Sequence, residues 1–74
     1  MIFGLDDKTI AELKHKYTPG TRIVLDHMGP DPRPIPDGTI GTVRIVDDAG
    51  QIHCDFDNGR RLALIYEVDA FHIA

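Results

Sequence analysis

The sequence has very little cysteine and no long apolar run. The single cysteine, Cys54, excludes an internal disulfide, and the chain contains no CxxC pair for a structural zinc site. No stretch approaches the roughly 20 apolar residues that a membrane-spanning helix requires. The first residues lack a basic segment and soon reach Asp6 and Asp7, so we expect no signal peptide. Without disulfides or membrane segments, we expect a cytoplasmic protein.

Positive charge is also scarce. Twelve acidic residues outnumber eight lysines and arginines, which gives a formal net charge of −4. Non-specific binding to nucleic acid depends on Lys and Arg contacting phosphates, so this balance disfavours it without excluding a local basic patch. The acidic residues are scattered along the chain, which argues against a disordered acidic tail.

The length of 74 residues fits one domain that spans residues 1–74. A chain of this size buries only about 60% of the surface that its unfolded form exposes. The fold must therefore be stabilised by apolar packing and sheet hydrogen bonds, or by a partner.

A short helix is expected at about residues 6–17. Asp6 has a side chain suited to the N-cap, where its carboxylate would accept from the first free N–H groups. Ile10, Leu13 and Tyr17 have the spacing of one apolar stripe. We expect this stripe to pack against the rest of the domain.

The remaining chain, about residues 20–74, has the pattern of a small barrel. Five strands are expected at residues 21–26, 38–46, 51–56, 61–64 and 70–73. A single helical turn is expected before the last strand. This layout predicts a mainly β fold, a small five-stranded SH3-like barrel with a short N-terminal α-helix. Closure of the barrel would leave few exposed strand edges.

The register of the first central hairpin follows from its loop length. A four-residue loop at 47–50 would pair Ile45 with Ile52 and Val43 with Cys54. All four side chains would then face the interior.

The second central hairpin contains Asn58-Gly59, but a two-residue loop would break the apolar face. A three-residue loop at 57–59 with a left-handed Gly59 would instead place Cys54 opposite Leu62. The expected interior consists of Val43, Ile45, Ile52, Cys54, Phe56, Leu62 and Leu64, with Phe71 and Ile73 of the last strand.

The segment 27–37 is unusual because proline occupies alternate positions along most of it. Proline fixes φ and removes backbone donors, so we expect a stiff, extended loop with polyproline character. One interpretation is a rigid connection across one end of the barrel. The other is a recognition loop that presents Arg33 and Ile35 outermost. With Asp31, and Arg60 from a neighbouring turn, these are the candidate residues for binding a partner.

Three adjacent residues, His53, Cys54 and Asp55, invite a nucleophile or metal interpretation. In a strand, neighbours point to opposite faces, so His53 and Asp55 are expected outside and Cys54 inside as a small apolar residue. His27 and His72 are candidate ligands by residue type alone. No catalytic motif is present, and we predict no metal site, no cofactor and no enzymatic activity.

The arginines near the second hairpin carry a second hypothesis. Asp57 is expected to neutralise Arg60 and Arg61. If Arg44 and Arg61 instead share one face with the helix lysines, that face would contact RNA or DNA. Tyr66 would then be the aromatic side chain for base stacking.

Six runs carry a family resemblance: PGTRIVL (19–25), PDGTIGTV (36–43), VDDAGQI (46–52), DNG (57–59), LAL (62–64) and VDAF (68–71). Together they resemble a family of small bacterial proteins known as a domain of unknown function, common in phages and mobile elements of Gram-positive bacteria. The resemblance covers about residues 17–73. It implies an SH3-like barrel and no catalytic residues. Residues 38–43 are also similar to KOW modules of ribosomal and transcription factors.

Three functions are therefore open. The leading hypothesis is a non-enzymatic SH3-like binding or adaptor module, encoded by a phage or mobile element, that engages a protein partner. The alternative is a KOW-like module that contacts nucleic acid or the ribosome. A third is a homo-oligomeric element that uses residues 1–5 and the helix as its interface. The sequence leaves open the partner's identity, the oligomeric state and any inhibition of a host system.

Overall fold

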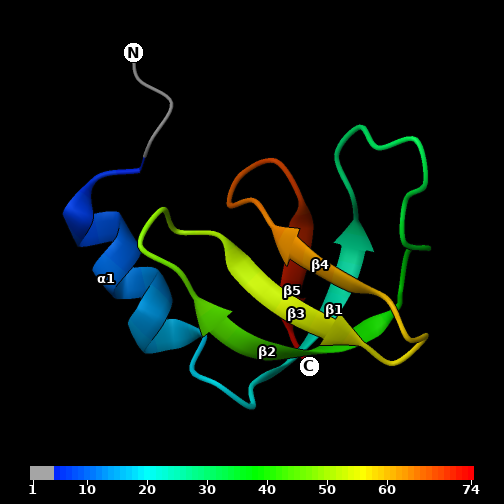
Figure 1. Ribbon diagram of the computed structural model, residues 1–74, viewed down its shortest axis with the longest axis horizontal. Coiled ribbons are helices and arrows are strands. Elements are labelled where there is room, and N and C mark those ends of the chain that lie inside the picture. The colour runs from blue at the N-terminus through cyan, green and yellow to red at the C-terminus, as the bar shows by residue number, and fades with distance from the viewer. Residues whose placement is uncertain (1–4) are drawn as a thin grey trace.

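The computed structural model describes residues 5–74, which form one helix and five strands. The elements are α1 (Asp7–Lys16), β1 (Arg22–His27), β2 (Ile40–Val46), β3 (Ile52–Phe56), β4 (Arg61–Leu64) and β5 (Ala70–Ile73). The strands form one antiparallel sheet in the order β4-β3-β2-β1-β5 (Figure 1). The predicted mainly β domain with five strands and a short N-terminal helix is confirmed. Within the described part of the chain, no helix has the length and apolar character to cross a membrane.

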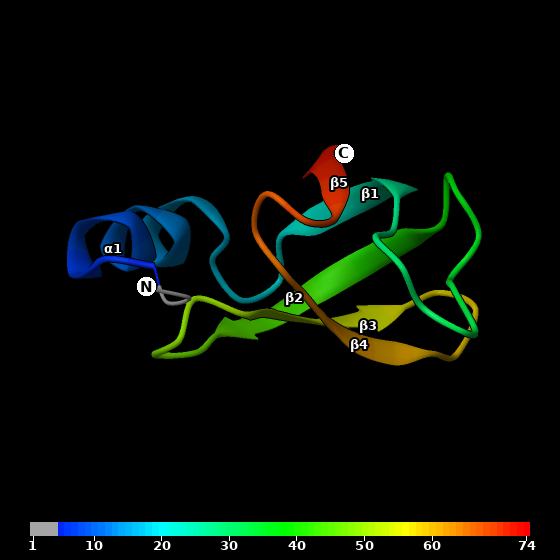
Figure 2. The same cartoon turned by 90° about the horizontal axis from the view of Figure 1, so that it is seen from above.

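The sheet is strongly bent into a barrel-like shape. In Figure 2, β2 crosses between a layer formed by β1 and β5 and a layer formed by β3 and β4. The hydrogen-bonded ladder begins at β4 and ends at β5. These two strands are both edges in the described chain, so the expected closure of the ladder is not seen there.

Helix α1 begins and packs as its sequence predicts. The Asp6 carboxylate accepts a hydrogen bond from the Thr9 N–H at 2.8 Å. Hydrogen bonding by the Thr9 side chain, and then by its N–H, lowers the pKa of Asp6. Leu13 and Tyr17 are buried, and the Tyr17 ring lies with its centroid 5.4 Å from that of Phe71. The helix therefore covers the end of the sheet near β2, where it makes its strand contacts.

The core lies between the two layers of the bent sheet and α1. It consists of Leu13, Tyr17, Ile23, Leu25, Met28, Ile35, Val43, Val46, Ile52, Cys54, Phe56 and Leu64. Leu62 and Phe71 are partly buried against it. Most of the predicted interior is confirmed by this set, and two of its members, Ile45 and Ile73, are not.

The first central hairpin departs from the predicted register. Val43 pairs with Cys54 as expected, but Val46 pairs with Ile52 in place of Ile45. A β-bulge between Val43 and Ile45 adds one residue to this strand, turns Ile45 outward to 56% exposure and buries Val46. The predicted pairing was wrong because counting alternate residues assumes a regular strand, and a bulge reverses the parity beyond it.

The second central hairpin has the predicted three-residue loop. Gly59 has φ 89°, and Cys54 pairs with Leu62. The Phe56 N–H donates to the Arg60 carbonyl at 2.8 Å and closes the loop. This loop requires a positive φ at its last residue, which glycine adopts readily because it has no Cβ.

The last strand lies at the edge of the sheet beside β1. Ile73 is opposite the buried Ile23, so it shares the inner face, yet it remains 44% exposed. Its predicted burial was wrong because β5 is an edge strand, with no further strand beside it among residues 5–74. A turn is present before β5, since the N–H groups of Val68 and Asp69 both donate to the Ile65 carbonyl. It is not the helical turn that was expected, because Glu67 has a left-handed φ of 68°.

Candidate functional site

The connection between β1 and β2, residues 28–39, is called the proline loop below. It folds back over one end of the sheet, and both Met28 and Ile35 enter the core. Ile35 is 1% exposed, and its N–H donates to the Met28 Sδ at 3.1 Å. The expectation that Ile35 lies outermost is wrong. Burying an isoleucine side chain stabilises a fold by about 2 kcal/mol relative to leaving it exposed, so the buried position of Ile35 is favoured.

The proline loop is fixed at several points. The Asp31 carboxylate accepts from the Arg33 N–H at 2.7 Å, a short turn of the kind that acidic residues favour. The Arg60 guanidinium donates to the Arg33 carbonyl at 3.0 Å, which joins the loop to the turn between β3 and β4. At the base of the loop, His27 Nδ1 lies 3.0 Å from the Asp37 carboxylate.

These contacts bring together three of the four candidate partner-binding residues, Asp31, Arg33 and Arg60. Arg33 is exposed, whereas Ile35 is withdrawn into the core. A partner could touch the first three but not Ile35, so the surface differs from the expected one in that residue. Their role in binding stays a prediction.

A second segment, the turn of residues 65–69, lies beside the proline loop and is called the apolar turn below. Figure 1 shows it between the proline loop and the loop that joins β2 to β3. Its conformation depends on Asp69, which is 8% exposed. The Asp69 Oδ1 accepts from the Gly29 N–H at 2.7 Å, and Oδ2 accepts from the Ile65 N–H at 2.8 Å.

One carboxylate therefore holds the two segments together. Its role was missed by sequence reasoning, because Gly29 and Asp69 are forty positions apart. The only local signal is an acidic residue directly before a short strand.

Arg44 and Arg61, the two arginines of the nucleic-acid alternative, lie close together on the sheet, and both are accompanied by the Asp55 carboxylate. Arg44 Nε lies 3.7 Å from the Asp55 carboxylate, and Arg61 Nε lies 3.3 Å from it. Tyr66 does not line the surface hollow bordered by Arg44 and Arg61. It packs partly buried against the core from the apolar turn.

Asp57 does not neutralise Arg60 and Arg61 as expected. It forms a two-pronged ion pair with Arg22, at 2.7 and 2.9 Å, which lowers the pKa of the Asp57 carboxyl. The Asp57 N–H donates to the Ile40 carbonyl, so its side chain lies beside β2 and within reach of β1. Arg61 lies instead on the far side of β3.

Cys54 and His53 do not form a catalytic pair. Cys54 is buried, and this burial raises the pKa of its thiol to about 11. His53 points outward, as predicted, and its Nε2 lies 2.8 Å from the Asp47 carboxylate. No group of three or more His, Cys, Asp or Glu side chains in residues 5–74 is close enough together to hold a metal ion.

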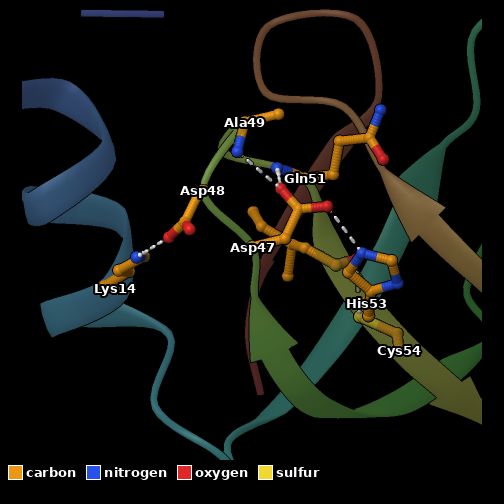
Figure 3. Close-up of polar contacts among 8 residues, drawn as sticks. Lys14, Asp47, Asp48, Ala49, Gln51, His53 and Cys54 are labelled. Atoms are coloured by element: carbon orange, nitrogen blue, oxygen red, sulfur yellow. Dashed lines mark hydrogen bonds and ion pairs between the residues drawn. The ribbon is translucent and has the colours of Figure 1, made fainter. Parts of the chain in front are cut away.

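Asp47 instead organises the loop between β2 and β3. Figure 3 shows its carboxylate between His53 and the loop backbone, where it accepts from the N–H groups of Ala49 and Gln51. Together with His53, these bonds lower the pKa of Asp47. The neighbouring Asp48 pairs with Lys14 of α1 at 2.7 Å. Asp47 and Asp48 therefore order the loop and join it to α1, and these structural roles account for both acidic side chains.

Of the comparisons with known proteins, only the one with protein families gives a match. Neither the curated proteins nor the solved structures include a match to this chain. The model of a family described as a domain of unknown function (DUF4314) matches residues 6–74. The match includes α1, which lies outside the resemblance seen in the sequence, and both edge strands of the sheet. The chain therefore belongs to the DUF4314 family.

Proposed function

We propose that this protein is a small, non-enzymatic binding module with SH3-like architecture that engages a protein partner through the proline loop. The single cysteine and the lack of a long apolar run support a cytoplasmic location, and the family resemblance supports a bacterial gene carried by a phage or mobile element.

The observation that carries the proposal is the fixed conformation of an exposed, proline-rich backbone. Met28 and Ile35 anchor the loop in the core, and Arg60 binds the Arg33 carbonyl from outside. Between these anchors, Pro32 and Arg33 are exposed. A loop that is already ordered loses little conformational entropy when a partner binds it, which favours affinity. Loops held on a rigid scaffold are also common places for binding residues.

Replacing Arg33 with alanine tests this proposal most cleanly. Asp31 and Arg60 both hold the loop through the Arg33 backbone, so changing either one would also disturb the fold. Arg33→Ala keeps that backbone and removes only an exposed side chain. Tagged wild type and variant are used to purify partners from the native cell, and mass spectrometry compares the recovered proteins.

We expect Arg33→Ala to reduce recovery of a specific partner about tenfold, equivalent to about 1.4 kcal/mol, with an unchanged melting temperature. Arg44→Ala, an arginine change on the outer face of the sheet, is the matched control and should leave recovery unchanged. Equal recovery with wild type and Arg33→Ala would refute the loop as the binding site.

The convergence of Arg44 and Arg61 on Asp55 supports nucleic-acid binding as a second candidate. If this face binds RNA, Asp55→Asn should strengthen binding at 50 mM salt by removing a negative charge beside two arginines. Absence of RNA binding by both proteins at that salt concentration would exclude this function.

A further inference from the structure

The apolar turn exposes two large hydrophobic side chains at one place. Ile65 is 47% exposed and Val68 is 55% exposed, although they are only three residues apart. The proline loop beside the turn buries Met28 and Ile35, and β4 before it buries Leu64, so apolar surface for packing is present next to the turn. Its exposed apolar surface therefore calls for another explanation.

The turn is held rigidly in a strained conformation. Glu67 at its tip has φ 68°, the left-handed region that a residue with a side chain adopts at a cost of about 1–2 kcal/mol. The bonds to the Ile65 carbonyl and the two bonds of Asp69 hold it there. Strain maintained by surrounding structure is more frequent at binding surfaces than elsewhere.

A hollow lies on each side of Val68. The first, of about 430 Å³, separates the turn from the proline loop and is lined by Val68 with His27, Met28, Pro30, Asp31 and Pro34. The second, of about 340 Å³, separates the turn from the β2–β3 loop and is lined by Val68 with Leu5, Ala49, Gln51, Ile65 and Tyr66. Val68 is thus a ridge between two largely apolar depressions.

The charges around this surface favour one kind of occupant. In residues 5–74, no Lys or Arg side chain lines either hollow, whereas Asp31 lines the first and Glu67 forms the tip of the turn. The whole chain also carries a net charge of −4. A second copy would bring like charges together, which opposes association, while a basic segment would be attracted.

We propose that the ridge and its two hollows bind an extended segment of a protein partner in which apolar side chains alternate with Lys or Arg. Apolar side chains two positions apart in such a segment lie about 7 Å apart on one face, so that they can enter the hollows on either side of Val68. The intervening basic side chains point away from the hollows, and their long flexible stems let the charged ends reach back toward the acidic groups of Asp31 and Glu67. This inference names the partner chemistry of the proposed binding module and rests on that function.

Short peptides test the chemistry directly. The probe is the blocked pentapeptide Lys-Leu-Lys-Leu-Lys, with Glu-Leu-Glu-Leu-Glu and Lys-Ser-Lys-Ser-Lys as matched controls. Each is titrated into the full 74-residue chain, and the amide signals of the protein are followed by NMR. We expect only the first peptide to give saturable shifts at Ile65, Glu67 and Val68.

Two variants locate the site. Val68→Ser removes the ridge and should weaken binding of the first peptide about tenfold. Ile45→Ser is the control, because Ile45 is equally exposed, at 56%, and lies on β2 away from the turn. Glu67→Gln should weaken binding more at low salt than at high salt, since its contribution is electrostatic.

Several results would overturn the inference. They are equal binding of the acidic peptide, equal loss in both serine variants, and absence of shifts at the turn up to millimolar peptide. Concentration-dependent shifts at the turn without peptide would assign the surface to a second copy. Binding that appears only after deletion of residues 1–4 would assign it to the chain's own N-terminal segment.

The inference and the proposed function fail separately. If Arg33→Ala abolishes partner recovery while Val68→Ser does not, the module binds a partner but not through the apolar turn. If the basic peptide binds at the turn while Arg33→Ala recovers its partner normally, the ridge and its hollows are a binding surface, and the Arg33 side chain is not part of the partner site.

Discussion

Asp69→Asn is predicted to separate the proline loop from the apolar turn while leaving the rest of the sheet intact. The carboxylate accepts one N–H on each oxygen, from Gly29 at 2.7 Å and from Ile65 at 2.8 Å. Asparagine has nearly the same shape but only one acceptor oxygen. Its amide group must therefore face one of the two N–H donors and leave that donor unpaired.

The size of the effect follows from the burial of this residue. Losing a hydrogen bond to a charged acceptor and leaving a partly buried N–H unpaired should cost about 2–3 kcal/mol. A domain of this size shifts its melting temperature by about 4–8 °C for each kcal/mol, so the expected fall is roughly 8–24 °C. Its whole stability is expected to be about 4–11 kcal/mol, so the variant should still fold at room temperature.

Urea unfolding followed by circular dichroism measures the change in free energy, and amide hydrogen exchange locates it. We expect the amides of Gly29 and Ile65 to lose protection before those of the central strands. Asp37→Asn is the control, because Asp37 lies on the same loop and its carboxylate pairs with His27 in an exposed position. An exposed pair of this kind contributes about 0–1 kcal/mol. A destabilisation of Asp69→Asn no larger than that of the control would refute the role given to Asp69.

Three further predictions concern a glycine of the sheet, the buried thiol and the loop between β2 and β3. A Cβ at Gly41 would lie 2.8 Å from the Phe56 ring, so Gly41→Ala should destabilise the domain by about 1–3 kcal/mol in urea unfolding, and Phe56→Leu should reduce that penalty in the double variant; additive effects would contradict the contact. Because burial raises the pKa of Cys54 to about 11, a thiol reagent at pH 8 should label it only as fast as the domain opens, and labelling at the rate of free cysteine would contradict its burial. His53 and the loop N–H groups lower the pKa of Asp47 below its usual 3.8, so its contribution to stability is present above that value and is lost as the pH falls through the lower folded pKa; Asp47→Asn should therefore flatten the loss of stability as the pH falls below about 4, and an unchanged loss of stability in acid would argue against these contacts.

The elements that sequence reasoning predicted correctly are those determined by local chemistry. The cap at Asp6 and the left-handed Gly59 each depend on residues within a few positions of one another, so both can be recognised from a short stretch of sequence. The bulge that exposes Ile45 and buries Val46 is different. It depends on how β2 bends across the core, and no residue type at this position indicates a bulge.

The candidate site was predictable only in part, for the same reason. Arg33 and Arg60 were expected together because hairpin connections bring their loops to one end of the sheet. The burial of Ile35 and the link through Asp69 depend on contacts between segments far apart in sequence. The pattern of alternate prolines favoured the wrong environment for Ile35, and no local pattern indicated the partners of Asp69.

In residues 5–74, β4 and β5 are the edge strands of the sheet, and this has a consequence for association. β4 and β5 are only four residues long, and they carry Arg61 and His72 respectively. Short margins with polar or charged side chains are poor templates for the addition of further strands from other molecules. Concentrated samples should therefore resist fibre-like stacking while the native fold persists, and an uncharged β-branched residue in place of Arg61 would weaken that protection.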